Sequence, residues 1–202
     1  MVRATAPTPA RPTEDVLLDA ARDAVIEHGI RRTSASDIAR RSGLSRQTLY
    51  RYWPDVRSLL AALVTRELLA QLPAAGAAGD TGAVTLDGFV TELVDTARTV
   101  RDLPIIARLR ETDPELFARY ILERLGSSQR AILDLLETRI HAAQAAGAVR
   151  AGDPPVIAAM ILLIAQSAIQ SAPLVAPWLP DDAWERELRI ALAGYLRPEV
   201  VA

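Results

Sequence analysis

The 202-residue sequence contains no cysteine, and all 23 of its basic residues are arginine rather than lysine. Without cysteine the chain has no disulfide, no thiolate zinc site and no cysteine nucleophile, which also fits a reducing compartment. Its two histidines, His28 and His141, lie far apart in the sequence and do not indicate a metal site. We expect no metal or other cofactor. The use of arginine alone favours bidentate contacts to phosphate and guanine, or reflects a GC-rich coding bias.

The sequence also lacks the features of a secreted, membrane-spanning or catalytic protein. Its N-terminus has no apolar core of the kind that a signal peptide needs. The longest apolar run, residues 156–165, has ten residues, whereas a spanning helix needs about 20. There is no glycine-rich phosphate loop and no pair of carboxylates at metal-ligand spacing. We therefore expect a cytoplasmic protein that is not an enzyme.

The charges are unevenly distributed along the chain. Residues 1–66 hold 11 arginines against 7 acidic residues, whereas residues 67–202 hold 12 against 18. The excess is largest between Gly29 and Arg57, with 7 arginines and 2 acidic residues. A basic N-terminal segment on an acidic body suits a single nucleic-acid-binding face. A chance fluctuation of charge is the alternative.

The chain begins with a predicted arm and a first helix. Residues 1–12 contain three prolines and no periodicity, which predicts a disordered arm. Arg3 and Arg11 could reach a DNA minor groove, or the arm is simply a solvated tail. Apolar residues at helical spacing then predict a helix over 13–28, capped by Thr13 and ended by Gly29.

Two short helices joined by a tight turn follow. The first of them begins at a predicted capping box, in which Ser34 accepts from the amide of Asp37 and Asp37 reaches back to Ser34. Gly43 supplies the left-handed backbone that turns the chain, and Ser45 caps the next helix. This pattern is typical of a helix-turn-helix, whose second helix enters the major groove of DNA.

The second of these helices carries polar and aromatic side chains where a core helix would carry aliphatic ones. Arginine reads guanine, glutamine reads adenine, and the threonine methyl contacts thymine; hydroxyl groups and guanidinium groups also bind phosphates. The predicted base readers are Arg46, Gln47 and Thr48, and the predicted phosphate contacts are Tyr50, Arg51 and Tyr52. The alternative is a pair of amphipathic helices in an ordinary bundle. That alternative explains the aliphatic positions but not this polar and aromatic set.

These residues carry a resemblance to a known family. The matching elements are Gly29, Thr33-Ser34, Asp37-Ile38-Ala39, Gly43-Leu44-Ser45, Thr48-Leu49-Tyr50, Tyr52, Trp53 and Leu59-Leu60. With these elements in register, the segment resembles the DNA-binding part of the tetracycline-repressor (TetR) family. The resemblance implies an all-α fold of about nine helices. A three-helix helix-turn-helix domain would be joined to a larger helical bundle for ligand binding and dimerisation.

The resemblance adds Thr33, Ser34 and Ser45 to the predicted DNA contacts. The family often has a lysine that touches a phosphate at the start of helix four, but this chain has Val56 there. The neighbouring Arg57 is a candidate DNA contact that could replace this lysine, from a different angle, or leave the contact unmade. We divide the chain into a disordered arm (1–12), a helix-turn-helix domain (13–58) and a regulatory, ligand-binding and dimerisation domain (59–202).

The remainder of the chain is predicted to be helical. The fourth helix begins near Asp55, a loop covers 73–81, and further helices cover 84–101, 104–112, 114–146, 154–172 and 181–197. The helix over 154–172 is apolar nearly all round, so most of its surface must be buried. The resemblance implies that the last two helices form the four-helix bundle of a homodimer; the alternative is packing within one monomer. A charge at Ile161 is predicted to break the dimer.

The resemblance also places a small-molecule cavity among the middle helices. The candidate ligand contacts, by their chemistry, are Arg108, Glu111, Phe117, Tyr120, Arg124 and Gln166. For each of them a solvated or structural role is the commoner explanation. The predicted function is a DNA-binding transcriptional regulator, most often a repressor, whose homodimer binds a palindromic operator and is released by a ligand. The alternative is a helical protein-interaction or enzyme domain without sequence-specific DNA binding.

Overall fold

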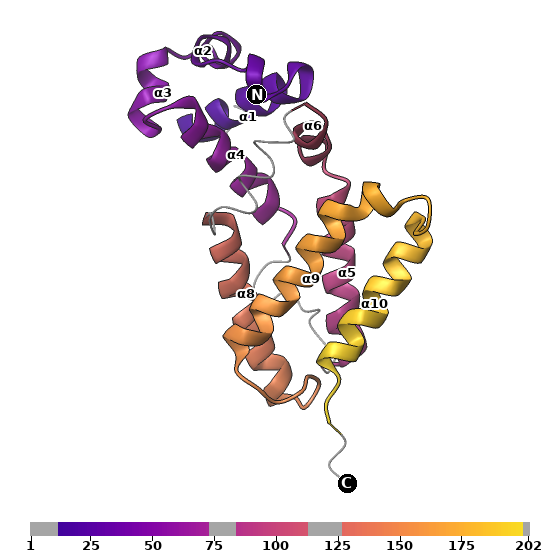
Figure 1. Cartoon of the computed structure of the whole chain (residues 1–202). Helices are drawn as coiled ribbons and strands as arrows, with labels where there is room; N and C mark the ends of the chain where they lie inside the picture. Colours follow the sequence, from indigo (N-terminus) through magenta and orange to yellow (C-terminus); the bar gives the residue numbers. More distant parts are fainter. Residues whose placement is uncertain (1–11, 73–83, 113–126, 200–202) are drawn as a thin grey trace, which may run out of the picture.

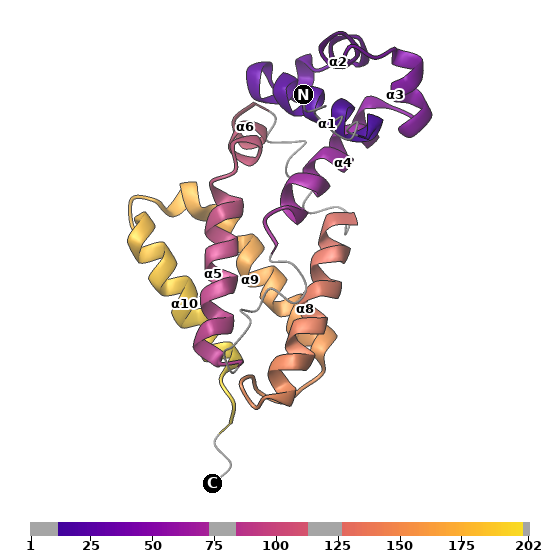
Figure 2. The same ribbon diagram turned by 180° about the vertical axis from the view of Figure 1, so that it is seen from behind.

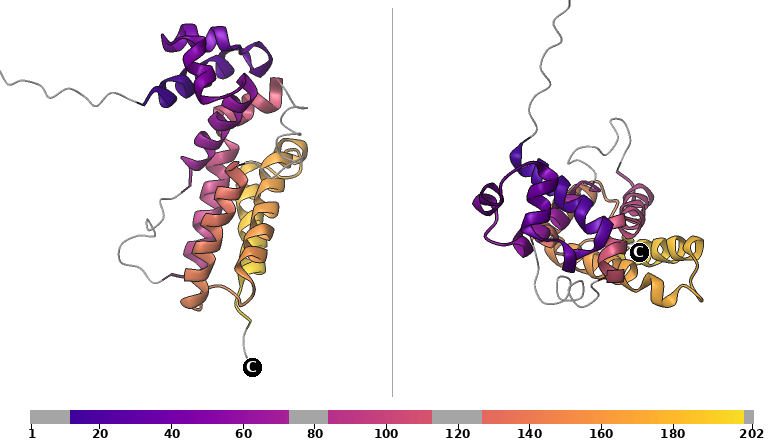
Figure 3. Two further views of the ribbon diagram at one scale, coloured as in Figure 1. Left: turned by 90° about the vertical axis from the view of Figure 1, so that its left-hand side faces the viewer. Right: turned by 90° about the horizontal axis from the view of Figure 1, so that it is seen from above.

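The computed structural model describes residues 12–72, 84–112 and 127–199. Over these residues the chain forms nine α-helices, one short 3-10 helix and no strand, so the predicted all-α fold is confirmed. Figure 1 shows a small N-terminal group of helices above a larger bundle. Figure 3 shows that the molecule is elongated, with the N-terminal group at one end and the long helices of the bundle along its axis.

The N-terminal group consists of α1 (Thr13–His28), a 3-10 helix (Ile30–Arg32), α2 (Ala35–Ser42), α3 (Arg46–Tyr52) and α4 (Val56–Leu69). The first helix has the predicted bounds and ends at Gly29, whose φ is 82°. The prediction that Thr13 caps this helix is wrong. Pro12 occupies the cap position, and no side chain bonds the first free amides.

The larger bundle contains α5 (Leu86–Arg101), α8 (Ser127–Ala145), α9 (Pro154–Val175) and α10 (Asp181–Leu196), and α6 (Pro104–Thr112) packs against the N-terminal group. Helix α8 is the described part of the helix predicted over 114–146. Helix α9 continues three residues beyond its predicted end at 172, because Pro173 lies within its last turn rather than after it. Helix α5 lies beside α10 and α9, as Figures 1 and 2 both show.

Two hydrophobic cores hold these helices. The first joins α1, α2, α3, α4 and α6, and it includes Leu17, Ile38, Leu49, Leu63 and Ile105. The second joins α5, α8, α9 and α10, and it includes Val90, Ile140, Ile157, Trp184 and Leu192. Helix α4 belongs to the first core as far as Val64 and also contacts α8 of the second. The first core thus extends past residue 58, where we placed the domain boundary; that boundary stays a prediction.

By length and composition only, α9 is long and apolar enough to cross a membrane: it has 22 residues, and the mean hydropathy of its most apolar 18-residue window is 1.7, a test that the core helix of a soluble protein also passes. Its length exceeds the apolar run counted in the sequence because the helix continues through the polar positions Gln166, Ser167 and Gln170. One face of α9 is buried against the bundle at Ile157, Ala158 and Ile161. Only 17% of its most apolar window is fully buried within one chain. Residues such as Ile164 and Ile169 are half-buried against the second core, whereas Val156, Met160 and Leu163 are exposed.

Candidate nucleic-acid interface and ligand cavity

The caps of α2 and α3 fix the helix-turn-helix. The Ser34 hydroxyl accepts from the amide of Asp37 at 3.2 Å, and the Ser45 hydroxyl accepts from the amide of Thr48 at 3.0 Å. Between these caps, Gly43 has φ 70° and ψ 11°, the left-handed conformation that lets the chain turn. The second half of the predicted capping box does not form: the Asp37 carboxylate accepts from Arg40 and Arg41 instead of the Ser34 amide.

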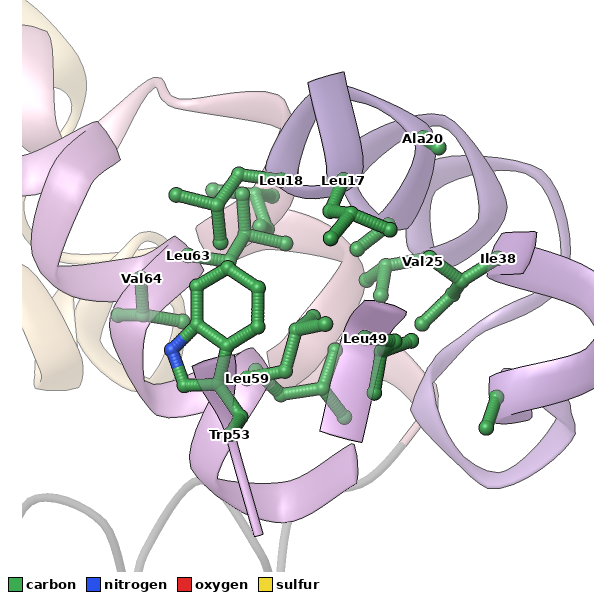
Figure 4. Packing of buried hydrophobic residues seen from close by; sticks show 14 of the residues in the cluster. Leu17, Leu18, Ala20, Val25, Ile38, Leu49, Trp53, Leu59, Leu63 and Val64 are labelled. Carbon is green, nitrogen blue, oxygen red and sulfur yellow. The ribbon is translucent and has the colours of Figure 1, made fainter. Parts of the chain in front are cut away.

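Helix α3 is anchored from below by two side chains. Leu49 is fully buried, and Trp53, just after the helix, retains 8% exposure. Figure 4 shows the Trp53 ring beside Leu59, Leu63 and Val64 of α4. The burial of Trp53 confirms that it closes the small core. Because these two side chains hold α3 from one side, the opposite side of the helix is exposed and available to a nucleic acid.

The outward side of α3 carries the predicted DNA contacts. The exposed members of this set are Ser34, Ser45, Arg46, Gln47, Tyr50, Arg51 and Tyr52, and Thr48 is half-buried. The Arg51 guanidinium lies 5.2 Å from the centre of the Tyr52 ring, which in turn lies 5.6 Å from the Trp53 ring. These contacts connect two exposed side chains to a buried one. Arg46 donates to the Ser36 hydroxyl at 3.5 Å, across to α2.

Thr33 does not fit the role we predicted for it. Its side chain is buried, and its hydroxyl donates to the carbonyl oxygen of Gly29 at 2.8 Å. A phosphate contact would require exposure, whereas this hydroxyl closes the turn between α1 and α2. Thr33 is therefore a structural residue in this conformation.

The start of α4 differs from the family pattern in the way the sequence indicated. Val56 is partly buried and packs against the first core. Arg57 is exposed, as a phosphate contact requires, but it also lines a cavity between the N-terminal group and the bundle. Asp55 caps α4: the amide of Ser58 donates to it at 2.6 Å, and this bond lowers the pKa of the carboxyl.

A polar network ties α2 to the end of α1. The Asp37 carboxylate lies 3.0 Å from Arg41 and 3.2 Å from His28, and Arg41 also reaches Glu27 at 2.6 Å. Burial opposes ionisation of Asp37, but the hydrogen bonds from Arg40 and Arg41 outweigh it and lower the pKa of this carboxyl. The network therefore links α1 to α2 in addition to the hydrophobic core that they share.

A cavity of about 520 Å³ lies beneath the helix-turn-helix. Helices α4, α5, α6, α8 and α9 line it with mostly aliphatic side chains, and Ile30 and Thr33 close its upper end. This volume is within the range of small-molecule sites, roughly 300–1,000 Å³. The cavity therefore extends from the middle of the bundle to the residues that position α2.

The predicted ligand contacts are only partly brought together. Gln166 lines the cavity, where its amide oxygen accepts from Gln129 at 3.1 Å. Arg108 does not line it, because its guanidinium donates to the Glu27 carbonyl at 3.2 Å. Glu111 is exposed and lies 3.8 Å from Arg108. We therefore withdraw Arg108 and Glu111 as ligand contacts. Phe117, Tyr120 and Arg124 lie outside the described residues.

Comparison with known proteins identifies the family. The family model described as bacterial regulatory proteins, tetR family, matches residues 17–63. An HTH-type transcriptional regulator of Mycobacterium bovis is 41% identical over 180 residues, which cover 89% of this chain and 92% of that protein. The chain belongs to the TetR family. It is a transcriptional regulator and not an enzyme.

Solved structures share the fold of this TetR-family chain. FadR of Bacillus subtilis, solved in complex with stearoyl-CoA, is 16% identical, with a TM-score of 0.62 over 91% of this chain and 99% of its own. SmeT of Stenotrophomonas maltophilia, solved in complex with triclosan, is 23% identical, with a TM-score of 0.61 over 94% and 97%.

Sequence reasoning missed most of the polar residues that line the cavity of this TetR-family regulator. They are Glu92, Thr96, Gln129, Arg139 and Gln170. Glu92 and Arg139 form an ion pair across α5 and α8. Gln170 follows Gln166 by one helical turn of α9, and that spacing was the available signal. The others come from separate helices, so only the packing of those helices brings them together.

Proposed function

We propose that this chain is a repressor whose homodimer binds a palindromic operator in the cytoplasm and is released by a small molecule bound in the cavity. The observation that carries DNA binding is the exposed polar and aromatic set on α3, held on a buried base of Leu49 and Trp53. A bundle helix without a ligand has no reason to expose Tyr50 and Tyr52, which are 50% and 40% exposed. The base readers would be Arg46, Gln47 and Thr48. The phosphate contacts would be Tyr50, Arg51 and Tyr52 of α3, together with Ser34, Ser45 and Arg57.

The apolar outer face of the last two helices supports a homodimer. Val156, Met160 and Leu163 recur along one face of α9 and are 61%, 42% and 60% exposed. Ile190 of α10 is 58% exposed. Two copies that pair through this face would cover it in a four-helix bundle. A two-fold dimer would also present two α3 helices to two half-sites of a palindrome.

The position of the cavity supports a ligand response. Its wall includes Ile30 and Thr33 beside α2 and Val56 and Arg57 at the start of α4. A molecule that fills the cavity would press on residues that position the two recognition helices. Ligand binding would then weaken operator binding, and operator binding would weaken ligand binding by the same coupling free energy. FadR of Bacillus subtilis and SmeT have the same fold and were solved in complex with stearoyl-CoA and triclosan, respectively, so small molecules do bind proteins of this fold.

The direct test is selection of random duplex DNA on the purified protein. The proposal predicts a palindrome, bound with an affinity that falls steeply with salt as phosphate contacts release counterions. Gln47→Ala should relax the preference at one base pair by about 1–3 kcal/mol, whereas Tyr52→Phe should weaken all sequences alike. Thr138→Ala, exposed on α8, is the control. No enriched sequence, or binding that is indifferent to salt, would refute operator recognition.

A further inference from the structure

The cavity wall contains one buried hydrogen-bond donor that has no partner. Among the described residues, three buried side-chain nitrogens lack a hydrogen bond: Nε of Arg108, Nη1 of Arg110 and Nε2 of Gln170. Of these three residues, Gln170 alone lines the cavity. Leaving a buried donor unpaired costs free energy, so such groups are normally satisfied. A bound molecule with an acceptor at this point would remove the cost.

Four other polar residues of the wall are already partnered. Nε2 of Gln129 donates to Oε1 of Gln166 at 3.1 Å, which joins α8 to α9 one turn away from Gln170. The charges on Glu92 and Arg139 compensate one another, and the Arg139 guanidinium lies 5.9 Å from the centre of the Phe89 ring. An ionised ligand beside Glu92 and Arg139 would have to break that pair or remain without a counter-charge, which is costly in an apolar site. The third charged residue that lines the cavity, Arg57, is exposed, so water already solvates its charge.

We infer that the effector is an uncharged, mostly apolar molecule with an acceptor oxygen, such as a carbonyl, that accepts a hydrogen bond from Nε2 of Gln170. This inference rests on the proposed ligand response and specifies its chemistry. The aliphatic wall takes the apolar part of the molecule, and Gln170 fixes the orientation of its polar end. Gln170 is therefore the specificity residue of the cavity.

Three probes of nearly equal shape test the inference: 2-acetylnaphthalene, which has a carbonyl; 2-ethylnaphthalene, which has none; and 2-naphthoate, which is an anion. Equilibrium dialysis of the full chain should show that 2-acetylnaphthalene binds about tenfold more tightly than 2-ethylnaphthalene. Gln170→Met should abolish this difference and leave the affinity for 2-ethylnaphthalene unchanged or higher. The naphthoate should bind most weakly.

Other results would overturn the inference. These are equal binding of the two uncharged probes, a carbonyl preference that survives Gln170→Met, or no binding of any probe. Tightest binding of 2-naphthoate, lost in Arg139→Gln, would assign the cavity to anions instead.

Two further measurements separate this inference from folding effects and from the proposed function. Because Gln170→Met removes an unpaired donor, the ligand-free variant should be at least as stable as the parent; clear destabilisation would contradict the assignment. Gln144→Met is the matched control and should be destabilised, since the Gln144 amide donates to the carbonyls of Arg150 and Gly152, both at 3.0 Å. Release of the operator DNA by each probe is measured in parallel. If a probe binds through Gln170 but does not release the operator, the inferred ligand chemistry holds and the proposed ligand response is refuted. If only an anion releases the operator, the proposed ligand response holds and the inferred ligand chemistry is refuted.

Discussion

The Arg108 guanidinium of α6 donates to the main-chain carbonyl of Glu27 near the end of α1, at 3.2 Å. The same helix inserts Ile105, Ile106 and Leu109 into the core of the helix-turn-helix. Helix α6 therefore packs with the N-terminal group, although it follows α5 of the larger bundle in the chain. Within the described residues, α6 and α4 both link the N-terminal group to the larger bundle.

Replacing Arg108 should weaken this link. Arg108→Met removes the donor to Glu27 and should lower the free energy of unfolding by about 1 kcal/mol, the typical worth of one hydrogen bond. Chemical denaturation measures the loss. Arg130→Met, exposed on α8, is the control and should have little effect. If both variants unfold alike, the hydrogen bond from α6 does not stabilise the N-terminal group.

Gly29 and Gly43 both have positive φ but should differ in their tolerance of a side chain. Gly29 has φ 82° and ψ 169°, and a Cβ there would lie 2.9 Å from Oγ1 of Thr112. Gly43 is left-handed with open space around it. Gly29→Ala should therefore cost about 2–3 kcal/mol of stability, and Gly43→Ala about 1 kcal/mol. Thermal melts compare the two. Equal costs would contradict the close contact with α6.

The low pKa of Asp37 predicts a specific acid sensitivity. Because folding lowers this pKa below the ordinary 3.8, the folded state binds fewer protons, and stability rises with pH through this window. The contribution is complete above about pH 4 and is lost as the pH falls through the lowered value. Asp37→Asn should thus be less stable than the parent at neutral pH, and the difference should shrink below pH 4. Asp23→Asn controls for the loss of one charge. A difference that is constant with pH would refute this role.

The proposed dimer is best tested on the exposed face of α9. The variant suggested by the sequence, Ile161→Asp, is unsuitable because Ile161 is 1% exposed within one chain, so the charge would disrupt the monomer. Leu163→Asp places the charge on the 60% exposed side instead. It should leave the helical content unchanged and convert the dimer to monomers in sedimentation experiments, since the interface would bury an unpaired ion. Arg130→Glu on α8 should remain dimeric. A persistent Leu163→Asp dimer would place the interface elsewhere.

The helix-turn-helix was largely predictable because its signals are local. The caps Ser34 and Ser45 and the turn at Gly43 act within a few residues, so their spacing alone fixes the two helices. The same locality explains the failure at Asp37: its carboxylate chooses partners in space, and the arginines one turn along and His28 of α1 compete with the Ser34 amide. The burial of Thr33 was not predictable for a similar reason, since only the fold shows that its hydroxyl points toward the Gly29 carbonyl.

By itself the sequence determined the all-α class, the bounds of α1 and α6, the caps of the recognition helices and the family, because these depend on short-range hydrogen bonding and helical periodicity. The tertiary structure alone decided how α6 packs, which face of α9 stays uncovered and which residues line the cavity. Arg108 illustrates the difference. Its position within an apolar helix suggested a ligand contact, yet the packing of α6 against α1 directs it to the Glu27 carbonyl. Gln170, whose neighbours come from distant helices, became a candidate only once those helices were placed together.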